Sequence, residues 1–126
     1  MARTVVSYSN LVPNSHLTSP AGTTIDATLV TNGVEIDVVD PEHTILRVAN
    51  THSAAHNVTV RAGSGTQAWM AGQGDLAVSV AATTGLEFIG PFTSARFQQD
   101  GSKLYVDFDA GFTGSITVLR MPKAWN

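Results

Sequence analysis

The sequence has no cysteine and few charged residues, and each shortage removes a class of function. Without cysteine there is no disulfide framework, no zinc–thiolate site and no blue-copper site. Charged residues make up 13% of the chain and the formal net charge is −3, so the basic footprint of a nucleic-acid-binding protein is missing. No apolar run approaches the ~20 residues that cross a membrane. The opening residues also lack the apolar core of a signal peptide. We therefore expect synthesis in the cytoplasm and neither a nucleic-acid nor a membrane partner.

Aromatic residues are scarce as well, at 7% of the chain. Trp69, Tyr105 and Trp125 are the candidates for a platform on which a sugar ring stacks, as in carbohydrate-binding modules. The three are dispersed along the sequence, which favours packing in a core or an interface instead. Trp125 follows Pro122 near the C-terminal end of the sequence, where little local core surrounds it. We therefore expect Trp125 to pack on a neighbouring protein.

The sequence is rich in short segments in which apolar and polar residues alternate. A period of two is typical of strands with one buried face. The segments are separated by turn signals such as Asn32-Gly33 and Asp100-Gly101. No segment keeps a helical period over several turns, and only a single helical turn is expected, between Trp69 and Asp75. Strands are predicted at residues 3–9, 24–31, 34–39, 44–49, 57–62, 76–80, 86–89 and 104–109 and around Ile116 and Val118, and Ala95 to Gln98 alternates in the same way.

This succession predicts an all-β protein, a single β-sandwich of jelly-roll or Greek-key type with about eight to nine short strands. The same alternation predicts the side chains that fill the space between the two sheets. These predicted core residues are Val58, Val60, Leu76, Val78, Val80, Phe97, Leu104, Val106, Phe108, Ile116 and Val118.

Two groups of polar residues invite a metal or acid–base interpretation. His52 and His56 stand four positions apart, but the segment between them has the composition of a turn, where this spacing does not bring side chains together as it does on a helix. Asp107 and Asp109 share one face of a predicted strand, where paired carboxylates can exchange protons or bind Ca²⁺. We interpret the histidines as a solvated loop and the carboxylates as an exposed strand face that discourages aggregation.

Catalytic motifs are missing too. No serine lies in a nucleophile motif, and the glycines at residues 63–65 and 72–74 lack the lysine and hydroxyl residue that complete a phosphate-binding loop. We predict no catalytic, cofactor-binding or metal-binding residue, and therefore no enzyme.

The first 22 residues hold one short alternating run and then a polar stretch with two prolines, whereas predicted strands follow one another in the rest of the chain. We predict that residues 1–22 form an extended N-terminal arm or connector before a sandwich domain at residues 23–126. Arg3 to Ser9 alternates and is suited to adding a strand to the open edge of a partner. Pro13 and Pro20 restrict the connector that follows. The alternative is that Arg3 to Ser9 pairs with the domain's own sheet. The candidate partner-binding residues are Arg3, Val5, Tyr8, Trp69 and Trp125.

An ordered series of short motifs runs through the later part of the sequence: Asn50-Thr51-His52, Val58-Thr59-Val60-Arg61-Ala62-Gly63, Ala71-Gly72-Gln73-Gly74-Asp75-Leu76, Ile89-Gly90-Pro91, Ala95-Arg96-Phe97, Asp100-Gly101-Ser102, Leu104-Tyr105-Val106-Asp107-Phe108 and Gly114-Ser115-Ile116-Thr117. In its order and spacing this series resembles small head proteins of tailed bacteriophages, especially those of actinobacterial hosts. Such proteins act as capsid decoration, or cement, proteins. The resemblance covers roughly residues 34–123.

The resemblance implies a β-sandwich that binds the outer surface of an assembled capsid and stabilises the particle. Its partners would be the major capsid protein and further copies of itself, as a homo-oligomer such as a dimer or trimer, and its place would be the exterior of the virion. It supplies no catalytic residue. The alternative is a carbohydrate- or receptor-binding β-sandwich module of a phage fibre or tail, which would expose coplanar aromatic rings.

Overall fold

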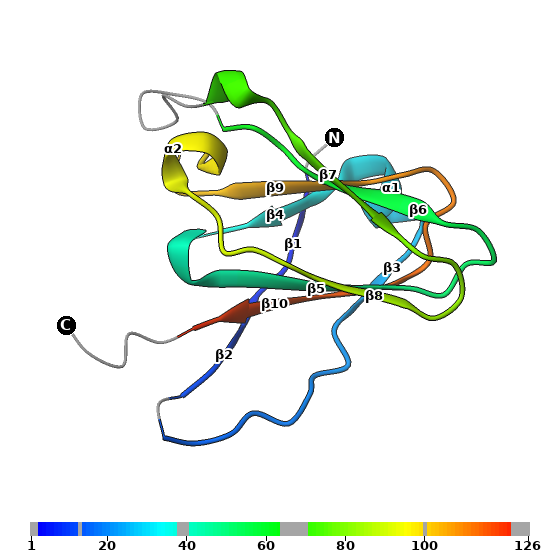
Figure 1. The fold of residues 1–126 in the computed structure, drawn as a ribbon, viewed down its shortest axis with the longest axis horizontal. Helices are drawn as coiled ribbons and strands as arrows, with labels where there is room; N and C mark the ends of the chain where they lie inside the picture. The colour runs from blue at the N-terminus through cyan, green and yellow to red at the C-terminus, as the bar shows by residue number, and fades with distance from the viewer. Residues whose placement is uncertain (1–2, 13, 38–40, 64–70, 100, 122–126) are drawn as a thin grey trace.

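The computed structural model describes residues 3–12, 14–37, 41–63, 71–99 and 101–121. Over these ranges the chain forms ten strands, two short α-helices and two 3-10 turns. The strands make two mixed sheets that pack face to face (Figure 1). The predicted β-sandwich is confirmed at this level, with more strands than the sequence indicated.

The first sheet has the strand order β1-β4-β9-β6-β7. Its strands are β1 (Thr4–Val5), β4 (Val34–Ile36), β9 (Leu104–Phe108), β6 (His56–Val60) and β7 (Leu76–Val80). The second sheet has the order β2-β10-β5-β8, and β3 also pairs with β10. Its strands are β2 (Tyr8–Asn10), β10 (Gly114–Arg120), β5 (Thr44–Asn50), β8 (Gly85–Ile89) and β3 (Thr23–Ile25).

Most connections cross from one sheet to the other. Only β2 to β3 and β6 to β7 stay within a sheet, and the other links carry the chain across the core. Neighbouring strands are therefore often far apart in sequence: β5 lies between β10 and β8, and β9 lies between β4 and β6. Which face of a strand is buried thus depends on partners that are remote along the chain.

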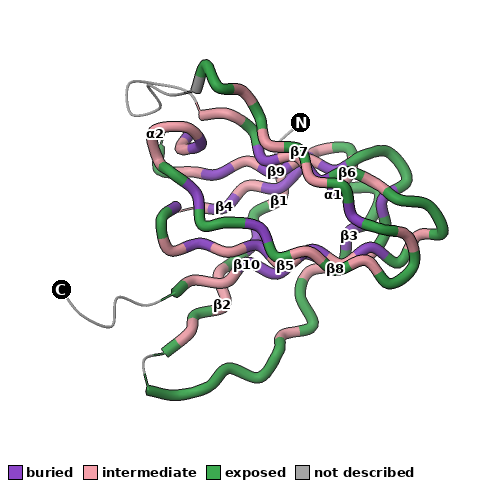
Figure 2. Tube along the Cα trace, in the orientation of Figure 1, coloured by how far each residue is buried: buried purple, intermediate pink, exposed green. Residues whose placement is uncertain are grey.

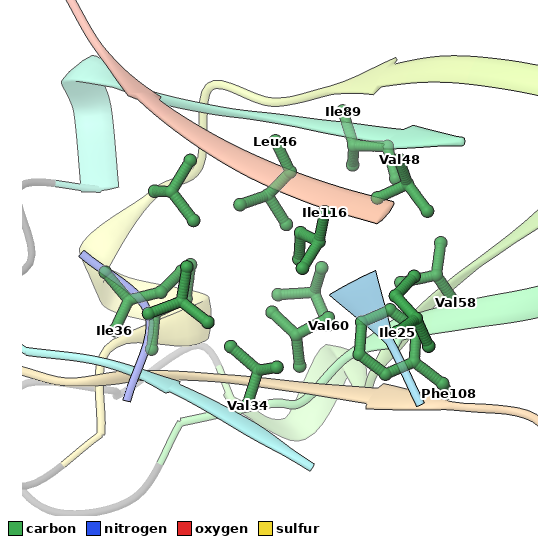
Figure 3. Close-up of a cluster of buried hydrophobic side chains, with 14 of the residues drawn as sticks. Ile25, Val34, Ile36, Leu46, Val48, Val58, Val60, Ile89, Phe108 and Ile116 are labelled. Atoms are coloured by element: carbon green, nitrogen blue, oxygen red, sulfur yellow. The ribbon is translucent and has the colours of Figure 1, made fainter. Parts of the chain in front are cut away.

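The core lies between the two sheets and is built from alternate residues of their strands (Figure 2). Figure 3 shows Val34, Val60 and Phe108 of the first sheet pointing toward Leu46 and Ile116 of the second. All predicted core residues are buried except Leu76 and Val78, which are partly buried on the edge strand β7 and pack against the core. β-Branched side chains fit this pleated, two-layer packing well.

The strand predicted at residues 24–31 is wrong beyond Ile25. Helix α1 (Ala27–Asn32) follows β3, and its start is fixed by Asp26, whose Oδ1 accepts a hydrogen bond from the Leu29 N–H at 3.0 Å. Asn32-Gly33 is consequently not a hairpin turn. Gly33 ends the helix with φ of 79°, a left-handed conformation that glycine adopts readily, and its N–H donates to the Leu29 carbonyl at 2.8 Å. The burial of Leu29 stabilises this short helix.

The alternation at Ala95 to Gln98 is also misleading, because Ala95 to Phe97 belong to one helical turn, which Gln98 caps, and not to a strand. Helix α2 (Ser94–Phe97) turns Phe97 into the core, where its ring meets Phe92 edge-on at a centroid distance of 5.4 Å. The two 3-10 turns are η1 (Pro41–His43) and η2 (Ala71–Gln73), and η2 lies in the segment where a single helical turn was predicted.

The N-terminal strands pair with the chain's own sheets. β1 runs parallel to β4, and β2 runs parallel to β10. Between them Val6 is 5% exposed and belongs to the core. This pairing matches the alternative considered for Arg3 to Ser9, and a contact of residues 1–22 with another subunit stays a prediction.

Within the described residues, no helix is both long and apolar enough to cross a bilayer.

Candidate protein-binding surface

The candidate binding residues at the N-terminus are only partly grouped, because Val5 and Tyr8 line one hollow that does not include Arg3. Arg3 lies at the edge of the first sheet, where its guanidinium pairs with Asp107 at 2.7 Å and covers the Tyr105 ring at 4.3 Å. Val5 is exposed on the same strand edge, whereas Tyr8 belongs to the second sheet and shares a 2.7 Å hydrogen bond with Thr44. Trp69 and Trp125 lie outside the described residues.

The two histidines interact with each other more closely than a solvated loop would suggest. His52 Nδ1 and His56 Nε2 lie 3.0 Å apart, and His56 Nδ1 lies 3.5 Å from Asp109 Oδ2. The His56 ring also packs beside Phe112. In the part of the chain that the structure describes, no three side chains of the metal-binding types are grouped to share an ion.

Asp107 and Asp109 are bound by different partners. Asp107 bridges Arg3 and Arg61, which lie 2.7 and 2.9 Å from its two oxygens. Asp109 accepts a hydrogen bond from the Asn57 N–H at 2.9 Å. Both carboxylates are therefore held in place by the surrounding sheet and loop.

The outer face of the first sheet is an ionic network. Arg61 reaches from Asp107 to Asp75, which lies 3.3 Å away. Just before β9 begins, Lys103 pairs with Glu35 at 2.7 Å and lies 3.6 Å from Asp37. The hydrogen bond to Glu35, aided by the charge of Asp37, raises the pKa of Lys103 above its ordinary value of 10.5. Charges of opposite sign satisfy one another on this face.

The outer face of the second sheet carries exposed apolar side chains, with Arg47, Ser115 and Thr117 among them. Residues of β5, β8 and β10 that alternate with the buried ones point away from the core, and the register places Arg47 between Phe88 and Thr117. Phe88 is 63% exposed and Leu86 is 49% exposed. We call this surface the apolar face; its residues are Ile45, Arg47, Ala49, Leu86, Phe88, Ser115 and Leu119. Thr117, on the same side of β10, is 2% exposed and lies under the segment between β2 and β3.

Strand β8 adds an open edge to the apolar face. Within the described residues β8 pairs only with β5, so the backbone groups on its other side carry no strand partner. An edge strand with exposed Leu86 and Phe88 is a template for association with another protein.

A hollow of about 190 Å³ lies where the apolar face meets the segment between β2 and β3. That segment forms the long loop at the bottom of the view in Figure 1. The lining is apolar except at Arg47 and Ser19, and the apolar lining residues are Leu11, Leu17, Pro20, Phe88 and Leu119. Of the described residues that line the hollow, Arg47 alone is charged.

The sequence interpretation missed Phe88, Leu86 and Arg47. A signal was present, because Leu86, Phe88 and Ile89 leave β8 with apolar residues on both faces, whereas β9 alternates strictly between apolar and polar. An apolar residue on the second face of a strand indicates that this face is covered by something.

Comparison of the chain with family models, with curated proteins and with solved structures gives no match in any of the three.

Proposed function

We propose that this protein is a structural module of a virion, a capsid decoration protein that binds the outer surface of the capsid through protein–protein contacts. The observation that carries the proposal is the apolar face, on which Phe88 is 63% exposed while the opposite face of the sandwich is an ionic network. Apolar patches with a polar surround typically mark interaction sites, and exposed aromatic residues typically dominate the binding energy.

The order of the strands supports the finer part of the proposal, a sandwich of jelly-roll or Greek-key type. Without β1 and β2, the sheets have the orders β3-β10-β5-β8 and β4-β9-β6-β7. Eight strands that alternate between two sheets in this way make two Greek keys, an arrangement found in viral capsid and lectin domains.

The motif series between Asn50 and Thr117, which resembles phage head proteins, supports the identity of the partner. Under this proposal the partners are the major capsid protein and other copies of this chain, in a dimer or trimer on the virion exterior. The chain would be made in the host cytoplasm and act without a cofactor, nucleic acid, membrane or catalytic step.

The competing function is a carbohydrate- or receptor-binding module of a fibre or tail. Sugar stacking favours an exposed aromatic platform. Among the described tyrosines, Tyr105 and Tyr8 each lie under an arginine, Arg3 and Arg120 respectively. The exposed ring of Phe88, on the same face of β8 as exposed Leu86, fits a protein surface better than a polar sugar.

The test is binding to capsids. Purified particles that contain this chain should hold it at a copy number close to that of the capsid protein, measured by quantitative mass spectrometry. In co-sedimentation with undecorated particles, Phe88→Ser should weaken binding by about 10-fold or more, as expected for a central aromatic contact. Arg61→Gln on the opposite face is the matched control and should bind as the wild type does. A Phe88→Ser protein that binds with unchanged affinity, or specific binding of the wild type to a glycan array, would contradict the proposal.

A further inference from the structure

The hollow beside Arg47 has features of an anchor site within the apolar face. Its volume is about 190 Å³, and an apolar cavity of about 150 Å³ is large enough to hold benzene. One phenyl or branched aliphatic side chain therefore fits among Leu17, Pro20, Phe88 and Leu119. Interface anchors are usually apolar or aromatic side chains seated in such pockets.

Arg47 gives this hollow a positive charge that pairs with no carboxylate among the residues that the structure describes. Its guanidinium donates to the hydroxyl of Ser19, to the carbonyl of Pro20 and to Thr117 Oγ1, the last at 3.0 Å. All three acceptors are neutral, and together they use three of the five N–H donors of an arginine. In contrast, Arg3 and Arg61 both pair with the carboxylate of Asp107. In the described part of the chain, the charged guanidinium of Arg47 is bound only by neutral hydroxyl and carbonyl oxygens.

The contacts of Arg47 also hold its guanidinium in place beside the hollow. Ser19 and Pro20 belong to the segment between β2 and β3, and Thr117 belongs to β10, so the guanidinium is held where the two meet. A cation already held in place loses little freedom when an anion binds, which favours binding.

We infer that the hollow binds an extended segment of a partner protein that presents a large apolar side chain and, two positions along, a carboxylate for Arg47. Side chains at positions i and i+2 of an extended chain lie on the same face, so one segment serves the hollow and the arginine together. A single cation among apolar residues does not suit nucleic acid, whose binding needs several phosphate contacts. The inference rests on the proposed function, since it names the chemistry that the apolar face recognises.

The test uses the full-length chain labelled with ¹⁵N and three blocked five-residue peptides as probes. The first has the order threonine, phenylalanine, threonine, aspartate, threonine; in the second asparagine replaces the aspartate; in the third alanine replaces the phenylalanine. Titration is followed by the backbone amide shifts in NMR spectra. The aspartate peptide should shift the amides around Arg47, Phe88 and Leu119. The asparagine peptide should bind about 10-fold more weakly, as expected for the loss of one charge-assisted hydrogen bond, and the alanine peptide should cause no shift at the same concentration.

Variants separate recognition from folding. Arg47→Gln should lose the preference for aspartate over asparagine, whereas Arg61→Gln should keep it. Phe88→Ala alters an exposed side chain that needs no repacking of the core, and it should weaken both phenylalanine peptides. Equal binding of the aspartate and asparagine peptides to the wild type, or shifts confined to β4 and β9, would overturn the inference.

The two proposals can fail separately. If Phe88→Ser releases the chain from particles but the wild type does not distinguish the peptides, the apolar face binds capsids without this anchor chemistry, and the inference is wrong. If the peptides bind as expected but Phe88→Ser stays on particles, the anchor site exists and the capsid function is wrong.

Discussion

The two outer faces of this sandwich both come from five strands but have opposite chemistry. On the first sheet, Arg3, Asp107 and Arg61 form a continuous set of ion pairs over β9 and β6. On the second sheet, Leu86 and Phe88 stand exposed on β8. The difference shows that an alternating strand specifies its inner face only. The outer face is free to become a solvated surface or a binding surface.

The two faces also differ in the free energy that each can contribute to binding. Exposed ion pairs add little to stability, with a median of about 0–1 kcal/mol each, but they leave few unpaired groups to attract a partner. The apolar face leaves hydrophobic area in water, and the free energy of burying that area becomes available on binding, at about 25 cal/mol per Å². Association is therefore expected on one side of the molecule, with the ionic face left toward solvent.

The largest expected effect is the loss of stability when a buried leucine of the second sheet, and not an exposed one, is truncated. Leu46→Ala on β5 removes a side chain that is 0% exposed, so it should lower the free energy of unfolding by about 2–5 kcal/mol. Leu86→Ala on the neighbouring strand β8 is the control; its side chain is 49% exposed, and the change should stay within about 0.5 kcal/mol. Urea unfolding followed by circular dichroism measures both. Equal losses for the two variants would mean that the apolar face is part of the core.

The sequence was sufficient to predict the strands in which apolar residues alternate regularly with more polar ones. In β9, Leu104, Val106 and Phe108 face inward between polar residues, and all three are buried as predicted. It was not sufficient at Ala27 to Asn32, where β-branched Thr28 and Val30 favour a strand locally. There the Asp26 cap and the burial of Leu29 outweigh that preference.

The candidate surface was harder to predict than the core, for a physical reason. Whether Phe88 or Ile89 points inward is decided by pairing with Arg47 and Leu46 of β5, about forty residues earlier in the sequence. Val6 shows the same dependence, because it fills the core only through the pairing of β1 with β4 and of β2 with β10. The open edge of β8 follows from the order of the strands and has no local signature.

A smaller loss of stability is expected when the central carboxylate of the ionic network is neutralised. Asp107→Asn leaves both Arg3 and Arg61 without their shared carboxylate, so it should cost about 1 kcal/mol at low salt. The loss should shrink in 1 M salt, where the screening length falls to about 3 Å. Glu87→Gln on β8 makes the same change of charge at a residue with no ion pair among the described residues and should have little effect. A loss at Asp107 that does not depend on salt would show that the site acts through packing.

The smallest effect concerns Lys103, at the end of the same face. The hydrogen bond to Glu35, with the charge of Asp37, raises the pKa of Lys103 above 10.5, so folding favours the protonated amine. Its contribution to stability is complete below pH 10.5, the ordinary value, and is lost as the pH rises through the higher pKa of the folded state. The difference in Tm between the wild type and Lys103→Gln should therefore be constant from about pH 8 to 10 and shrink above that range. Arg61→Gln is the control, because arginine stays protonated to above pH ~12 and its difference in Tm should not change over the same range. A Lys103→Gln difference that persists at about pH 12 would mean that the lysine stabilises the fold through its aliphatic stem and not through its charge.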